Sequence, residues 1–191
     1  MAAIDGLIAA GWVIFWLYWI ISATRTKKNA SSNSYVRRFI GVRIVILIFV
    51  IVALHLSAGA RRSLGKIPLV QNNHALIVTG LVLFVSGLSL AIWARLYLGK
   101  NWGMPMSLKQ DPELVTSGPY RLIRHPIYSG FLLALLGSAL AISLYWLIIL
   151  VFAGGYFIYS AFIEDRIMLH QFPKTYPSYK AKTRMLIPFV L

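Results

Sequence analysis

Long apolar runs alternate with short polar segments along the whole chain, and the lengths of these runs predict membrane-spanning helices. A helix needs about 20 mostly apolar residues to cross the hydrocarbon core of a bilayer. Three runs fit this requirement, at residues 6–23, 39–58 and 75–98, and the second of them contains Arg43 and His55. A further apolar run extends from residue 126 to residue 163.

The run from 126 to 163 is too long for one span. As a single helix it would reach roughly 57 Å, about twice the thickness of the hydrocarbon core. We therefore predict two helices, 126–143 and 145–163, folded into a tight hairpin near Ser143, Leu144 and Tyr145. The expected fold is a single all-α integral membrane domain, residues 1–191, with five transmembrane helices. Segments 99–125 and 164–191 then lie at the cytosolic face, and the second forms a helical tail.

Small residues mark one face of the predicted helix 126–143. Gly130, Ala134, Gly137 and Ser138 follow one another at spacings that place them on the same side of a helix. Such a face lets two membrane helices approach closely. Gly154 and Gly155, in the following helix, are interpreted either as the facing surface or as a kink.

Composition supports the membrane assignment and adds an orientation. The chain is 59% hydrophobic, against about 45–50% in soluble domains. Its net charge of +14 is one signature of nucleic-acid binding, but the basic residues lie between the apolar runs, which favours the positive-inside rule and no nucleic-acid partner. In a five-span topology this rule predicts an outside N-terminus and a cytosolic C-terminus. The chain has no cysteine, which excludes disulfides and thiolate metal sites, and no metal is expected.

The polar motif GPYRLIRHPIYSG, residues 118–130, stands directly before the fourth predicted span. His125-Pro126 predicts a helix start, because proline is favoured at the first helical position and disfavours the α region in the residue before it. The free N–H groups of a helix start attract anions, and the rings of Tyr120 and Tyr128 attract cations. A ligand with both a carboxylate and a positive centre suits this place. The alternative is a purely structural role, in which the arginines and tyrosines only anchor the chain at the membrane interface.

An acidic pair, Glu164-Asp165, follows the last apolar run. A carboxylate at this depth is costly unless it is paired or functional. One interpretation is that the pair merely marks the exit from the membrane and forms ion pairs with Arg124 or Arg166. The other is that it belongs to a functional site, and the residues alone leave both open.

From about residue 94 onward the chain resembles the isoprenylcysteine carboxyl methyltransferase family, and more distantly the phospholipid N-methyltransferases. The similarity rests on an ordered series of motifs rather than on one. These are Leu98-Gly99 with Asn101-Trp102, then 114–120 (LVTSGPY), 124–130 (RHPIYSG), Glu164-Asp165, Phe172, Tyr176, Tyr179 and Pro188. The chain is identified on this basis as a prokaryotic-type member.

The resemblance implies an integral membrane methyltransferase that uses S-adenosylmethionine without a Rossmann domain. Its cofactor pocket would lie at the cytosolic ends of the last helices and be covered by the C-terminal tail. The implied cofactor-binding residues are Leu114, Val115, Tyr120, His125, Pro126, Ile127, Tyr128 and Glu164. Catalytic roles are expected for Glu164, Asp165 and Arg124. The expected partners are the lipid bilayer and a hydrophobic or lipidated methyl acceptor.

The chain departs from the family at several positions, and one of these bears on the acceptor. Pro112 replaces a histidine that is common in the family, and Ser160 replaces an arginine that eukaryotic members link to the acceptor. The favoured reaction is carboxyl O-methylation of an isoprenylcysteine-like or other hydrophobic acceptor. The alternatives are phospholipid or amine N-methylation, and a non-enzymatic scaffold or transporter. The expected location is the cell membrane in a prokaryote and the endoplasmic reticulum in a eukaryote.

Overall fold

The structure, a computed structural model, describes residues 2–24, 73–103, 106, 111–144 and 146–187. The predicted span 39–58, with Arg43 and His55, lies outside these residues. The elements are α1 (Ala2–Ala23), α4 (His74–Leu98), η1 (Gly99–Asn101), η2 (Gly118–Arg121), α5 (Pro126–Ala141), α6 (Trp146–Gln171) and α7 (Tyr176–Lys182). Apart from one isolated bridge between Ile123 and Arg184, the described residues form only helices, turns and loops, which confirms the all-α prediction.

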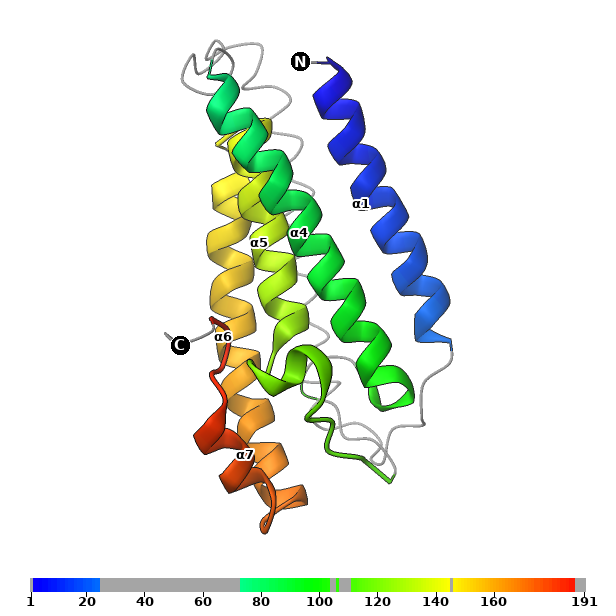
Figure 1. Cartoon of the computed structure of the whole chain (residues 1–191), viewed down its shortest axis with the longest axis vertical. Coiled ribbons are helices and arrows are strands. Elements are labelled where there is room, and N and C mark those ends of the chain that lie inside the picture. The colour runs from blue at the N-terminus through cyan, green and yellow to red at the C-terminus, as the bar shows by residue number, and fades with distance from the viewer. Residues whose placement is uncertain (1, 25–72, 104–105, 107–110, 145, 188–191) are drawn as a thin grey trace.

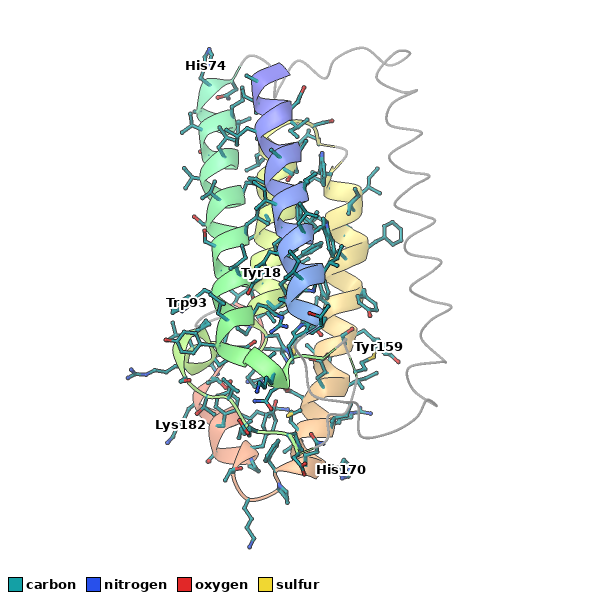
Figure 2. All side chains as sticks on the ribbon, turned by 90° about the vertical axis from the view of Figure 1, so that its right-hand side faces the viewer. Tyr18, His74, Trp93, Tyr159, His170 and Lys182 are labelled. Carbon is teal, nitrogen blue, oxygen red and sulfur yellow. The ribbon has the colours of Figure 1, made fainter. Side chains whose placement is uncertain are left out.

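Three of the described helices, α1, α4 and α6, are long and apolar enough to cross a membrane, and α5 is a shorter apolar helix. Helices α1 and α4 run in the same direction, α5 runs back, and α6 returns (Figure 1). In Figure 2 His74 lies at one end of this bundle, and His170 and Lys182 lie at the other. We call the end with His170 and Lys182 the site end.

The apolar run from 126 to 163 folds as the length argument predicted, since α5 and α6 are two helices joined by residues 142–145. The predicted end of the second helix at residue 163 differs from the structure. Helix α6 continues to Gln171 and closes with a bond from the Phe172 N–H to the Met168 carbonyl. The acidic pair therefore lies inside α6, with about two further turns after it.

Helices α4 and α5 touch through their backbones. A Cβ added to Gly87 of α4 would lie 2.5 Å from the nitrogen of Ala134, and one added to Gly130 of α5 would lie 2.6 Å from the nitrogen of Ala91. The small face predicted on α5 thus packs against a matching small face on α4. Of the two interpretations of Gly154 and Gly155, a close facing surface is not supported: among the described residues nothing lies within 4 Å of a Cβ at Gly155, and the atom nearest to a Cβ at Gly154 is 3.9 Å away, in the Leu132 side chain.

Helix α1 packs through aromatic side chains instead. Trp12 and Phe15 are buried in the core with Phe84 of α4, and the indole Nε1 of Trp12 donates to Ser138 Oγ over 3.1 Å. At the site end the guanidinium of Arg95 donates to the carbonyls of Ser22, over 2.6 Å, and Gly99, over 2.8 Å. These bonds hold the end of α1 beside the end of α4.

Candidate active site

A cavity of about 330 Å³ opens at the site end, where α1, α4 and α6 end and α5 begins. This volume is within the range of small-molecule sites, roughly 300–1,000 Å³. One half of the wall is aromatic and comes from Phe15, Trp16, Trp19, Trp102, Phe131 and Phe157. The rest of the wall, which we call the polar half, mixes apolar residues with polar ones, and the polar ones include Asn101, Glu113, Arg124, His125, Glu164, Gln171, Tyr176 and Tyr179.

The structure brings most of the sequence-predicted residues to this cavity. Its wall includes Leu114, Val115, Tyr120, Arg124, His125, Ile127, Tyr128 and Glu164. Pro126 is not part of the wall but is buried at the first turn of α5, where it sets the helix start. Asp165 is buried beside the cavity and does not line it.

Local geometry explains why the motif 118–130 bends as it does. Gly118 has φ +58, a left-handed conformation that favours glycine, and a Cβ there would lie 2.5 Å from the ring of Tyr97. Pro119 follows in the first turn of η2. His125 stands at the N-cap of α5 and makes no side-chain capping bond. Its imidazole is therefore directed to the acidic pair instead of the helix end.

Glu164 lies where the two halves of the cavity meet. Its Oε1 accepts from the Tyr128 hydroxyl over 2.6 Å and from the Met106 N–H over 2.9 Å, and its Oε2 lies 3.3 Å from His125 Nδ1. A carboxylate offers about four acceptor positions, so capacity remains for a ligand. Stacked rings continue from this point into the aromatic half: His125 on Tyr128, with centroids 5.4 Å apart, and Tyr128 on Phe157, with centroids 4.5 Å apart.

Asp165 has a different environment. Its Oδ1 accepts from Arg124 Nε over 3.2 Å and from the Tyr176 hydroxyl, and its Oδ2 lies 2.9 Å from Lys180 Nζ. The Arg124 pairing is one that the sequence suggested. His125 Nε2 lies 3.5 Å from Oδ1 of Asp165.

The imidazole of His125 is placed between two carboxylates. Burial alone would lower the pKa of His125, but the hydrogen bonds and charges of Asp165 and Glu164 outweigh it, so the pKa of His125 lies above its ordinary value. Burial also raises the pKa of Tyr120 and of Tyr176, and it raises the pKa of Tyr179 to about 12. These three phenols are neutral hydrogen-bond donors at physiological pH.

The C-terminal tail, residues 172–187, is fastened to the motif by backbone bonds. The N–H groups of Arg124 and His125 donate to the carbonyls of Arg184, over 2.8 Å, and Met185, over 3.1 Å. Further along, Ser129 Oγ donates to the Leu186 carbonyl over 2.6 Å. Through Tyr176 and Tyr179 the tail supplies part of the cavity wall.

Sequence reasoning missed the aromatic half of the cavity. Phe15, Trp16 and Trp19 come from α1, which precedes the region of family resemblance. Their spacing of one and four residues puts them near one helix face, a weak signal that equally fits a membrane-interface belt. Trp102 belonged to a recognised motif, but no role was assigned to it.

Comparisons with known proteins identify a family, a related sequence and a similar fold. The family described as phospholipid methyltransferase matches residues 75–175. A cobalt-zinc-cadmium resistance protein, CzcN, of Cupriavidus metallidurans is 32% identical over 167 residues, which cover 84% of this chain and 68% of the relative.

Among solved structures, the eukaryotic intramembrane Ras methyltransferase ICMT (isoprenylcysteine carboxyl methyltransferase) is similar, with a TM-score of 0.61 and 23% identity. The similarity covers 78% of this chain and 53% of that one, so this chain spans about half the length of that enzyme. At this identity the likeness shows a shared fold. Because the family match runs through α4, α5 and α6, which carry Tyr128 and Glu164, the chain belongs to the phospholipid methyltransferase family.

Proposed function

We propose that this membrane methyltransferase uses S-adenosylmethionine and methylates a hydrophobic or lipidated acceptor at the cytosolic membrane face. The observation that carries the proposal is the position of Glu164, a half-buried carboxylate at the junction of a polar and an aromatic half-cavity. Membership of the family supports methyl transfer as the reaction class, and the cavity supports the site end as its location.

The residues present fit the cofactor. The ring faces of Tyr120 and Tyr128 suit a sulfonium, because aromatic faces attract cations. The remaining acceptor capacity of Glu164 suits an ammonium or ribose hydroxyls. The start of α5, which receives no side-chain cap and whose Ile127 and Tyr128 line the cavity, suits a carboxylate.

The aromatic half fits the apolar part of the acceptor. Phe157 and Glu164 are both on α6, so at 1.5 Å per residue this half extends about 10 Å from the carboxylate. Trp16 of α1, a helix long and apolar enough to cross a membrane, lines the cavity and is 48% exposed. This double position supports an acceptor that arrives from the bilayer.

When bound, S-adenosylmethionine supplies an electrophilic methyl group on a sulfonium. A carboxylate acceptor is already a nucleophile at neutral pH, so the aromatic wall contributes by alignment and by exclusion of water. We propose this carboxyl O-methylation as the reaction, on an isoprenylcysteine-like or other hydrophobic acceptor.

N-methylation of a phospholipid or other amine is the second candidate, and Ser160 favours it. Ser160 is buried and its hydroxyl donates to the Tyr156 carbonyl over 2.8 Å, so it provides no cation for an acceptor carboxylate. An ammonium acceptor must lose a proton before it attacks, and Glu164 is the carboxylate placed to take it.

The orientation we propose places the site end in the cytosol and the N-terminus outside. The exposed basic side chains of Arg121, Lys174, Lys182 and Arg184 surround the site end, as the positive-inside rule requires of a cytosolic face.

Calorimetric titration of the purified protein in lipid nanodiscs tests the cofactor. We expect saturable binding of S-adenosylmethionine and S-adenosylhomocysteine, and we expect Glu164→Gln to weaken it roughly 10- to 100-fold, because a hydrogen bond to a charged group is lost. Asp111→Asn, an exposed acid that does not line the cavity, is the control and keeps wild-type affinity. Absence of saturable binding in the wild type would refute the proposal.

Methyl-labelled cofactor and native membranes then identify the acceptor. A label released by mild base is a carboxyl methyl ester, whereas a base-stable label in the lipid fraction is an N-methyl product. Label in neither fraction, with binding intact, would exclude both reactions and favour a non-enzymatic role.

A further inference from the structure

The two adjacent carboxylates of α6 face different parts of the structure. Neighbouring residues on a helix point about 100° apart, and here Glu164 points into the cavity while Asp165 points toward the C-terminal tail. We propose that Asp165 is a positioning residue, which docks the tail, residues 172–187, against the start of α5 and so holds one wall of the cavity. The link to cofactor binding rests on the proposed function, whereas the docking itself does not.

Three segments of the chain meet at the Asp165 carboxylate. Arg124 comes from the motif before α5, and Tyr176 and Lys180 come from α7. The residue is only 3% exposed, and both of its oxygens have partners. A buried carboxylate that is paired on both oxygens fixes its partners in place, and loss of its charge leaves buried donors without an acceptor.

Arg124 extends the docking to the backbone of the tail. Its Nη1 donates to the carbonyl of Thr183 over 2.6 Å and to that of Lys180 over 3.3 Å. Because Asp165 accepts from Nε of the same guanidinium, it sets the orientation from which Nη1 reaches both carbonyls. Asp165 therefore holds the tail in two ways: directly through the side chains of Tyr176 and Lys180, and through Arg124 by the backbone carbonyls.

The tail needs such an anchor. Helix α7 has seven residues, well below the length at which an isolated helix is stable in water. Tyr176 and Tyr179 of this helix line the cavity, so a loosened α7 removes part of the wall without any change at Glu164.

A second path joins Asp165 to Glu164 through His125. The imidazole has Nε2 3.5 Å from Asp165 Oδ1 and Nδ1 3.3 Å from Glu164 Oε2, and its ring is stacked on Tyr128. The charge of Asp165 thus also lies close to the ring that faces the cofactor-side carboxylate. The titratable groups near this ring are Glu164 and Asp165 from α6, Arg124 and Tyr128 beside it in the chain, and Tyr176 and Lys180 from the tail.

Limited digestion with trypsin reads out the docking directly, because the tail contains Lys174, Lys180, Lys182 and Arg184. In nanodiscs we expect Asp165→Asn to speed cleavage at Lys180 to Arg184 roughly tenfold, since cleavage follows local opening. Glu164→Gln and the control Asp111→Asn keep the wild-type cleavage rate. Wild-type cleavage in Asp165→Asn would overturn the proposal, and so would equally fast cleavage in Glu164→Gln.

Two further measurements separate positioning from a general loss of structure. In NMR of nitrogen-labelled histidine, we expect Asp165→Asn to move the titration of His125 to lower pH while the other histidine signals keep their wild-type positions, whereas a general loosening of the fold would shift all of them. If Asp165→Asn does not fold, Tyr176→Phe and Lys180→Gln each remove one partner. Each must raise cleavage at Lys182 and Arg184, sites that both variants keep, for the proposal to stand.

Binding of S-adenosylhomocysteine connects the docking to function. We expect Asp165→Asn to weaken it roughly tenfold, with bound cofactor slowing tail cleavage in the wild type. If the wild type binds no cofactor, the proposed function fails, but the cleavage rates still decide the role of Asp165. If binding is normal in Asp165→Asn although the tail is released, the link to the cavity wall is refuted and only the docking remains.

Discussion

Replacement of Gly87 by alanine tests the backbone contact between α4 and α5. The new Cβ would lie 2.5 Å from the nitrogen and 3.0 Å from the Cα of Ala134, and 2.6 Å from the Gly130 carbonyl oxygen. All three atoms belong to the backbone of α5, so no side chain can rotate away. Ordinary contact begins near 3.4 Å, so the helices must separate by about 0.9 Å at this point.

The size of this separation sets the expected loss of stability in Gly87→Ala. A gap of 0.5–1 Å forfeits about a quarter to a half of the dispersion energy of the contacts that it opens. In a lipid bilayer such packing is a main source of helix association, because lipid is as apolar as the helices. Overpacking of this kind typically costs about 1–3 kcal/mol. For a chain of this length, 2 kcal/mol corresponds to a fall in Tm of roughly 4–8 °C.

Thermal unfolding in one detergent, followed by circular dichroism, measures this change. Gly155→Ala is the matched control, since it makes the same substitution inside a membrane helix where nothing lies within 4 Å of the Cβ. Alanine is favoured over glycine in a helix interior by up to about 1 kcal/mol, so the control holds or raises Tm. Equal Tm values for Gly87→Ala and Gly155→Ala would show that the helices are not in backbone contact.

Two other predictions follow from the site end. Gly118→Ala lowers Tm in the same assay by an amount equivalent to about 1–2 kcal/mol, because alanine is strained at φ +58 and its Cβ would meet the Tyr97 ring. Gly6→Ala, inside α1 with nothing within 4 Å of the Cβ, is its control and holds or raises Tm. His125 gives a pH dependence whose sign is fixed by its raised pKa: its protonated form stabilises the fold fully below about pH 6.5, and this contribution is lost as pH rises through the folded pKa. The Tm difference between wild type and His125→Gln therefore shrinks as pH increases, and a difference that grows with pH would contradict the ion pairs with Glu164 and Asp165.

Much of the fold was predictable, because membrane-spanning helices are read from length and hydropathy. Residue 126 as a helix start followed from proline chemistry, and the turn between α5 and α6 followed from the thickness of a bilayer. The end of α6 was not predictable in this way. Hydropathy falls at Glu164, but the helix continues because both acids find partners on other segments of the chain.

The site was only half predictable, for a related reason. The motifs identified the wall near His125, Tyr128 and Glu164, since these residues are close in sequence to recognisable turns. The contacts of α1 are long-range, and nothing in its own sequence distinguishes Phe15 or Trp19 as cavity residues. Likewise the separate roles of Glu164 and Asp165 depend on which side of α6 the tail occupies, and local sequence does not specify that.

The backbone contact between α4 and α5 has a consequence for gating. Two helices in backbone contact are expected to move as one rigid body, so the acceptor proposed above is not expected to enter between them. The remaining walls are attached more loosely: α1 by aromatic rings and the Arg95 clamp, and the tail by Asp165 and a few backbone bonds. For the acceptor and orientation proposed above, the expected routes of entry therefore lie beside α1 and beside the tail, with the α4–α5 pair as the rigid part of the structure between them.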